Sequence, residues 1–225
     1  MAVIRSLYDR SPKVRVTAAE CLGKMKIKTR ATVAALTKCL SDRFYEVRMR
    51  SAESLGILLS GTSKSPRALV HRLKDPDELV RVETAEALGA IGDPMSVPSL
   101  IRTLGDPSPL VRSYVAVAIG AVGDKKALRT IEARLLRERN DTAKVGFYEA
   151  LYLLGKHEAI INLQRLSKSK NYRVRCAVAN VLGTTVGSSN AQGAVRFLEK
   201  WLKEEKAVAV KSTLRANLGG LAEGK

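Results

Sequence analysis

Apolar residues recur along this chain at the three- and four-residue spacing of one helix face, and the whole pattern is repeated seven times. In the clearest copy, Val80 and Arg81 open the stretch, and Leu88 and Gly89 close it. The closing glycines are Gly23, Gly56, Gly89, Gly120, Gly155, Gly183 and Gly219, at intervals of 28 to 36 residues. A period in this range predicts stacked units, each of which buries its apolar face against its neighbours.

Within each unit the pattern predicts two antiparallel helices joined by short turns. Asp75 is expected to cap a helix that begins one residue later, and Asp106 is expected to do the same in the next unit. Gly92 is expected to end the first of these helices, and Asp93 to cap the one that follows. No segment alternates apolar and polar residues for long enough to predict a strand. The sequence therefore predicts an all-α fold, a right-handed α-solenoid of about seven two-helix repeats.

We expect one solenoid domain over residues 1–225, because stacked units need no boundary between them. Polar segments at residues 60–65 and 187–193 are expected to be loops between repeats. The repeats are expected at approximately residues 1–25, 26–60, 61–92, 93–123, 124–155, 156–187 and 188–225.

Glycine, aspartate and arginine each recur at a fixed position of the unit. Glycine inside a helix costs about 0.5–1 kcal/mol relative to alanine, so its repetition indicates that a neighbouring helix crosses there. The charged residues are expected to cap helices and to pair between units rather than to carry acid–base or phosphate chemistry, so no catalytic residue is predicted. They are Asp9, Asp42, Asp75, Asp106 and Asp141, and Arg15, Arg48, Arg81, Arg112 and Arg175.

Residues 75–93 and 97–106 closely resemble HEAT repeats, and more narrowly the short bacterial HEAT repeats of the phycobilisome-lyase-like type. The resemblance implies the fold but not the function, since such repeats occur in scaffolds, lyase subunits, hydroxylases and DNA glycosylases. HEAT hydroxylases bind iron through several His–Glu pairs, and this chain has one such pair, at His157. HEAT-like glycosylases surround the nucleotide with tryptophans, and this chain has only Trp201. The resemblance therefore disfavours both of these activities.

The chain is strongly basic, with 39 Lys and Arg against 22 Asp and Glu and a net charge of +17. The excess lies in residues 1–60 and 124–225, and it favours an acidic protein, nucleic acid or an anionic surface as a partner. The three cysteines and two histidines lack metal-ligand spacing, so no metal site or cofactor is predicted. The cysteine usage fits a reducing cytoplasm, and no apolar run is long enough for a membrane span.

The leading prediction is a non-enzymatic scaffold that binds an acidic protein or peptide on its concave surface. The resemblance implies that the second helix of each unit lines that surface, where tyrosines would supply contact area. The alternative is that the tyrosines of the fifth unit pack a locally irregular core. The oligomeric state does not follow from the sequence. The expected partner-binding residues are Arg50, Glu83, Tyr114, Tyr148 and Tyr152.

Basic clusters support a second interpretation, a nucleic-acid-binding protein whose clusters align along a phosphate backbone. A third, implied by the family resemblance, is an enzyme subunit like the phycobilin lyases. The expected anion-binding residues are Lys24, Lys26, Lys28, Arg30, Lys126, Arg129, Arg137, Arg165, Lys168, Lys170 and Arg173.

Overall fold

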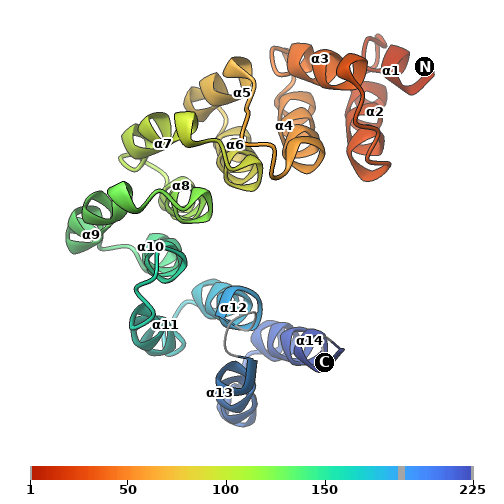
Figure 1. Ribbon diagram of the computed structural model, residues 1–225. Coiled ribbons are helices and arrows are strands. Elements are labelled where there is room, and N and C mark those ends of the chain that lie inside the picture. Colours follow the sequence, from red (N-terminus) through yellow and green to blue (C-terminus); the bar gives the residue numbers. More distant parts are fainter. Residues whose placement is uncertain (1, 187–190, 224–225) are drawn as a thin grey trace.

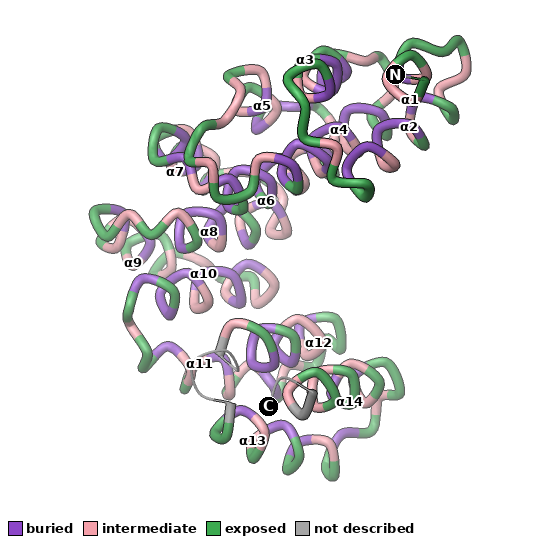
Figure 2. Tube along the Cα trace, turned by 45° about the vertical axis from the view of Figure 1, so that its right-hand side comes forward, coloured by how far each residue is buried: buried purple, intermediate pink, exposed green. Residues whose placement is uncertain are grey.

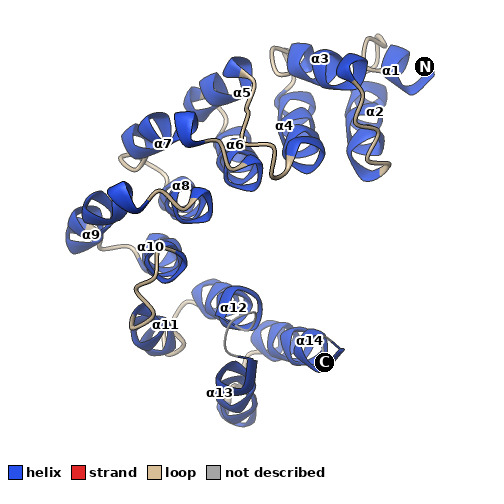
Figure 3. Ribbon diagram, viewed as in Figure 1, coloured by secondary structure: helices blue, strands red, loops and turns tan. Residues whose placement is uncertain are grey.

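The computed structural model describes residues 2–186 and 191–223, and every regular element in these ranges is a helix (Figure 3). The helices form a two-layered arc (Figure 1), which confirms the all-α solenoid. The inner layer consists of α2 (Pro12–Lys24), α4 (Tyr45–Leu59), α6 (Glu78–Ile91), α8 (Pro109–Val122), α10 (Asp141–Leu153), α12 (Tyr172–Val181) and α14 (Val208–Glu223).

The outer layer holds the first helix of each unit. Its members are α1 (Ala2–Ser6), α3 (Arg30–Cys39), α5 (Arg67–His71), α7 (Val97–Thr103), α9 (Leu128–Arg137), α11 (Ala159–Leu166) and α13 (Ala191–Glu204). Single turns η1 (Arg72–Lys74), η2 (Pro94–Ser96) and η3 (Lys125–Ala127) adjoin α5, α7 and α9, and the π-turn η4 (Leu182–Val186) follows α12. The expected placement of second helices on the concave side is therefore confirmed.

The third inner helix starts later than expected. It begins at Glu78 because the side chain of Asp77 caps it, accepting two backbone N–H groups at 2.9 and 3.3 Å. Asp75 is therefore not its N-cap. The same correction applies to Asp106, since Ser108 caps α8.

Other expected boundaries are confirmed. Gly92 ends α6 with a positive φ of 72°, and the side chain of Asp93 caps η2. Residues 60–65 form the loop between α4 and α5. Of the loop expected at residues 187–193, residues 187–190 lie outside the described ranges. Residues 191–193 belong to α13 and not to a loop.

A ladder of arginine–carboxylate pairs ties successive units together. Each arginine donates through Nε and Nη2 to both oxygens of an acid in the next unit, and through Nη1 to two carbonyls of its own turn. Asp141, expected in this ladder, instead begins α10 and lies 3.6 Å from Lys144. The rungs are Arg15–Asp42, Arg48–Asp75, Arg81–Asp106, Arg112–Glu138 and Arg175–Glu205.

Five of the seven recurring glycines, all except Gly155 and Gly219, mark points of close approach between successive units. A Cβ atom on Gly56 would lie 2.8 Å from the Cα of Ala87, and one on Gly120 would lie 2.8 Å from the Cα of Ala150. Both distances are shorter than any ordinary carbon–carbon contact, which confirms the close backbone approach.

The fifth unit departs from the expected register. Gly120 is crossed by Ala150, and Ala150 stands two residues before Tyr152. In the fourth unit, the residue that crosses Gly89 is Ala118, and it likewise stands two residues before Gly120. Tyr152 therefore occupies the glycine position of this unit. Gly155, expected there, lies in the turn after α10 with a φ of 97°.

The altered register places bulky residues where α10 faces α12. Tyr148 and Tyr152 replace the alanine and glycine of other units, and Lys144 replaces the ladder arginine. The buried apolar residues accordingly form two clusters that meet at α10, with Tyr152 in the second. Figure 2 shows buried residues on each inner helix from α2 to α12. α10 packs much less extensively on α12 than on α8. The boundary between the fifth and sixth units is therefore a distinct joint in the stack.

Candidate partner-binding groove

The concave face carries a groove made of two adjoining hollows of about 550 and 510 Å³. The first lies over α4 and α6, and the second extends over α6, α8, α10 and α12. They share Glu86 and Ala90. Glycine and alanine make up much of the floor, because the inner helices approach too closely there for larger side chains. We call these two hollows the inner groove.

The inner groove is acidic although the chain is basic. Its lining carboxylates are Glu53, Glu83, Glu86 and Glu149, and its one lining cation among the described residues is Lys26. The sequence interpretation missed three of the four acids. The signal was present, because a glutamate precedes the glycine-register position by three residues in four of the units, at Glu20, Glu53, Glu86 and Glu149.

Three of the groove carboxylates, Glu83, Glu86 and Glu149, have pKa values raised above that of a free glutamate. Burial, followed by repulsion from Glu86 and Glu53, raises the pKa of Glu83 to about 7, against the opposing effect of Arg50. Burial also raises the pKa of Glu149, although the hydroxyl of Thr185 donates to it at 2.5 Å. Raised pKa values of this kind show that the cations near the groove do not offset the burial and mutual repulsion of its carboxylates.

Tyr114 supplies an aromatic surface inside the groove. Its side chain lines the second hollow with Glu149 and is 37% exposed. Burial, and then the negative charges of Glu86, Glu83 and Glu149, raise the pKa of its phenol. The hydroxyl is therefore a neutral donor beside carboxylates. A phenol of this kind can contact a partner through its ring and its hydroxyl together.

Arg50 does not supply a free positive charge to the concave face. Its guanidinium donates to Glu53 at 2.7 Å, and both side chains are about one-third exposed. The pair is thus internal to the groove wall. The acidic partner expected from the sequence would meet the unpaired acids beside it.

Tyr148 and Tyr152 do not line the inner groove. Tyr152 is buried, 8% exposed, with its ring edge-on to His157 at 4.8 Å. Tyr148 is half-buried and packs against both core clusters. The expectation of a shared tyrosine patch with Tyr114 is corrected by the register change. Two residues rotate a side chain by about 200° around a helix, so Gly146 takes the position equivalent to Tyr114.

The candidate anion-binding residues are all exposed, but they lie at two edges of the solenoid. Short turns join the helices of each pair, which therefore run antiparallel and place outer-to-inner and inner-to-outer turns at opposite edges. The turn with Lys24, Lys26, Lys28 and Arg30 leads from an inner to an outer helix, as does the turn that contains Lys126. These residues lie at the edge opposite the arginine ladder.

The remaining candidates lie on or beside the ladder edge. Lys168, Lys170 and Arg173 surround the turn between α11 and α12, and Arg137 ends α9 close to the same edge. Arg129 and Arg165 lie along outer helices. Apart from Lys24, which pairs with Glu20, none of the candidates forms an ion pair with a described residue. The clusters expected to align in one stripe are thus divided between edges.

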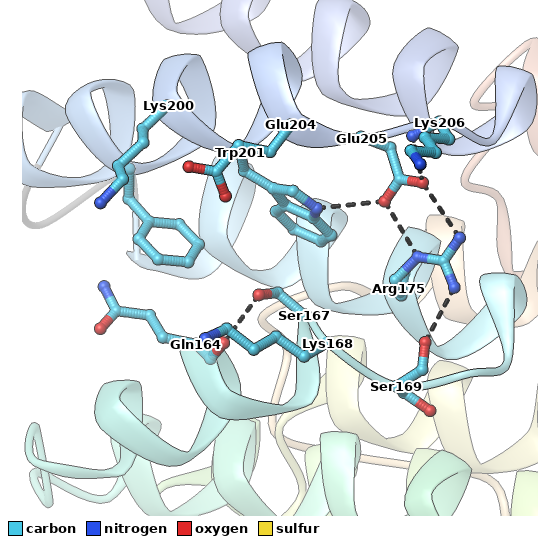
Figure 4. A pocket seen from close by; sticks show the side chains of 11 residues that line it. Gln164, Ser167, Lys168, Ser169, Arg175, Lys200, Trp201, Glu204, Glu205 and Lys206 are labelled. Carbon is cyan, nitrogen blue, oxygen red and sulfur yellow. Dashed lines mark hydrogen bonds and ion pairs between the residues drawn. The ribbon is translucent and has the colours of Figure 1, made fainter.

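A further hollow of about 530 Å³ lies between α11, α12 and α13 (Figure 4). Arg175 and the indole N–H of Trp201 both donate to Glu205, which forms the last rung of the ladder. Trp201 is buried, and its N–H is satisfied. The tryptophan therefore has a packing role rather than an open stacking face.

Two classes of site are not found in the described part of the chain. Across residues 2–186 and 191–223, no three His, Cys, Asp or Glu side chains converge in a way that could hold a metal ion. None of the described helices is long and apolar enough to cross a membrane.

Comparisons with known proteins agree with the geometry. Residues 2–81 and 66–152 match the model of the HEAT-repeat family. No curated protein sequence matches the chain. The complex of CpcE and CpcF of phycocyanin lyase from Nostoc sp. PCC7120 is similar in structure, with a TM-score of 0.70 and 21% identity over 97% of this chain and 93% of that chain. A designed armadillo repeat protein gives a TM-score of 0.44 and 16% identity over 98% of both chains. The matched residues span more than half of the sequence, and the chain therefore belongs to the HEAT-repeat family.

Proposed function

We propose that the protein is a non-enzymatic scaffold that binds a protein or peptide segment in the inner groove. The observation that carries the proposal is the inner groove itself, which four glutamates line and which contains the partly exposed ring of Tyr114. A solenoid presents an extended concave surface of this kind to its partners. The sequence favoured an acidic partner, but the groove charges favour a segment that carries lysine or arginine.

Electrostatic complementarity explains why the expected partner changes from an acidic segment to a basic one. The positive field of the whole chain acts at long range, whereas a bound segment meets the local charges of the groove. A cation placed between Glu83 and Glu86 would relieve their mutual repulsion. An acidic segment would add to it, and like charges held together cost several kcal/mol.

A peptide titration tests the proposal. We would measure fluorescence anisotropy of a labelled basic amphipathic peptide and of an acidic peptide of equal length. The basic peptide should bind, and the double variant Glu86→Gln/Glu149→Gln should weaken it about tenfold or more. The matched control is Glu132→Gln/Glu199→Gln, which removes two acids from outer helices α9 and α13. Preference for the acidic peptide, or equal loss in both double variants, would overturn the proposal.

The second candidate function is an enzyme subunit related to phycocyanin lyase. The support is the fold shared with CpcE and CpcF, and the inner groove is a cavity of the right class for a small ligand. Co-expression with a bilin tests it, because a lyase subunit should yield a coloured protein or transfer the pigment to an acceptor. A colourless product with every acceptor would remove this candidate.

A further inference from the structure

We propose that the edge of the solenoid carrying the arginine ladder binds the phosphate backbone of a nucleic acid. The surface differs from the inner groove and from the stripe of clusters expected from the sequence. The proposal rests on two observations: a cation that recurs at one position of the outer-to-inner turns, and the internal neutralisation of the acids beside it.

In five of the seven outer-to-inner turns, a lysine or arginine directly follows the position at which the ladder acids stand. In the third and fourth turns, a proline takes its place. All five side chains are exposed, and none forms an ion pair with a described residue. They are Arg10, Arg43, Arg139, Lys170 and Lys206.

Hydrogen bonds place these turns side by side. The guanidinium of Arg15 contacts the carbonyl of Arg10 and, in the next turn, the carboxylate of Asp42, which is adjacent to Arg43. The later rungs repeat this link. The fifth and sixth turns have no rung between them, and the hydroxyl of Ser169 donates to Asp141 at 3.2 Å instead. The turns therefore form one continuous edge.

The ladder also explains why the edge is positive although it contains acids. Each ladder acid accepts two hydrogen bonds from a guanidinium, so its charge is already matched. The recurring cations have no such partner. The edge therefore presents surplus positive charge to a partner at Arg43, Arg139, Lys170 and Lys206, whereas Arg10 lies beside Asp9, whose carboxylate pairs with no guanidinium of a described residue.

Three hollows between successive units lie along this edge, with volumes of about 510, 370 and 530 Å³. Ladder acids line each of them beside unpaired cations, and the third contains one further acid, Glu204 (Figure 4). The additional cations are Lys74 and Arg102 in the first, Arg134 and Arg137 in the second, and Lys168 and Lys200 in the third.

A nucleic acid fits this arrangement better than a compact anion does. Packed inner helices lie about 8–10 Å apart, so the cations are spread along a line rather than focused on a point. A phosphate backbone offers negative charge continuously along such a line. Tyr8, Tyr45 and Tyr172 are exposed beside the same turns, where their rings can contact sugars or unpaired bases.

Anisotropy titrations of the full chain with a labelled duplex, and with one of its single strands, test the proposal at two salt concentrations. We expect binding that weakens steeply with salt. The edge variant Arg43→Gln/Arg139→Gln/Lys170→Gln should weaken binding about tenfold or more and reduce the salt slope by about three. Tighter binding of the single strand than of the duplex would indicate that the tyrosines contact bases. Tighter binding of the duplex would indicate that the edge contacts the phosphate backbone alone.

The matched control removes equal charge from the opposite edge, in Lys28→Gln/Lys64→Gln/Lys126→Gln. This variant should retain nearly the affinity of the unchanged protein. Absence of binding at low salt, or equal losses in the two triple variants, would overturn the proposal. Equally effective competition by polyglutamate of matched charge would also overturn it, since the edge would then select charge and not nucleic acid.

Discussion

The guanidinium of Arg48 holds both carboxylate oxygens of Asp75, with Nε and Nη2 donating at 2.8 and 2.7 Å across the boundary between the second and third units. The side chains are 10% and 0% exposed. Loss of Arg48 would leave the buried Asp75 carboxylate with Arg72, at 3.2 Å, as its one charged partner, and breaking a buried pair costs about 3–5 kcal/mol. We expect Arg48→Ala to lower the free energy of unfolding by that amount, measured by urea denaturation.

The matched control lies on the same helix. Arg50 pairs with Glu53, but these side chains are 35% and 33% exposed. Pairs of this kind contribute at most about 1 kcal/mol. Arg50→Ala should therefore have a small effect on the free energy of unfolding. An equally small effect of Arg48→Ala would show that the ladder does not stabilise the stack.

The last rung gives stability a pH dependence at acidic pH. Burial alone would raise the pKa of Glu205, but hydrogen bonds from Arg175, two backbone N–H groups and Trp201 lower it to about 2. A group with a depressed folded pKa stabilises the fold above its unfolded pKa, here near 4.5, and loses that contribution as the pH falls toward 2. The stability difference between the unchanged protein and Glu205→Gln should shrink over this window.

Chemical denaturation at a series of pH values measures this difference. Glu204→Gln is the matched control, because the neighbouring carboxylate is exposed and belongs to no rung. Its difference from the unchanged protein should stay constant. A constant difference for Glu205→Gln as well would rule out the proposed linkage.

The close helix crossing makes Gly56 sensitive to a single methyl group. A Cβ there would lie 2.8 Å from Ala87, and overpacking of this kind costs about 1–3 kcal/mol. This exceeds the gain of about 0.5–1 kcal/mol that alanine normally brings to a helix. Gly56→Ala should therefore lower the melting temperature.

Gly219 provides the control at the same register position. Nothing lies within 4 Å of a Cβ on this glycine, so Gly219→Ala should be neutral or stabilising. Thermal unfolding of the two variants separates crowding from helix propensity. Destabilisation by both substitutions would contradict the crossing argument.

Tyr152 and Tyr114 should respond in opposite ways to the same substitution. Tyr152 is buried at the joint after α10, and removal of a buried aromatic side chain costs about 3–5 kcal/mol. Tyr152→Ala should therefore reduce stability. Tyr114→Ala should cost less stability, because this side chain is 37% exposed, and it should weaken binding of the basic peptide. The reverse result, in which Tyr152→Ala weakens binding and Tyr114→Ala has the larger effect on stability, would indicate that the partner binds at the fifth unit.

The repetition in the sequence was sufficient to predict the solenoid, because recurring elements have a direct physical cause. Gly56 must lack a Cβ, and Arg48 must reach an acid in the next unit. The helix starts were harder to predict, since Asp75 and Asp77 both have the chemistry of an N-cap. The capping geometry selects Asp77, while the ladder takes Asp75.

The candidate site was only partly predictable, because it depends on register. A displacement of two residues in the fifth unit was enough to assign Tyr148 wrongly, since Val145 and Gly146 imitate the usual opening of the repeat. The acidity of the groove was hidden for another reason. The net charge of +17 describes the whole chain, whereas Glu83 and Glu86 share one hollow.

Glu83 should make the affinity for the partner depend on pH in the neutral range. Its folded pKa of about 7 lies above the ordinary value of 4.5, so its contribution to stability is complete below 4.5 and is lost as the pH rises through 7. The groups that face it are Glu86, Glu53 and Arg50. Carbon-detected NMR of the carboxyl should give a midpoint near 7 in the free protein.

A bound cation would stabilise the Glu83 carboxylate and lower its pKa, because an opposite charge favours the ionised form. Binding of a basic peptide should therefore release a proton from Glu83, and its affinity should rise as the pH increases through 7. Glu83→Gln removes the titrating group and should make the affinity nearly independent of pH in this window. Affinity that falls with rising pH, or a midpoint that stays at 7 when the peptide is bound, would show that the cation does not contact Glu83.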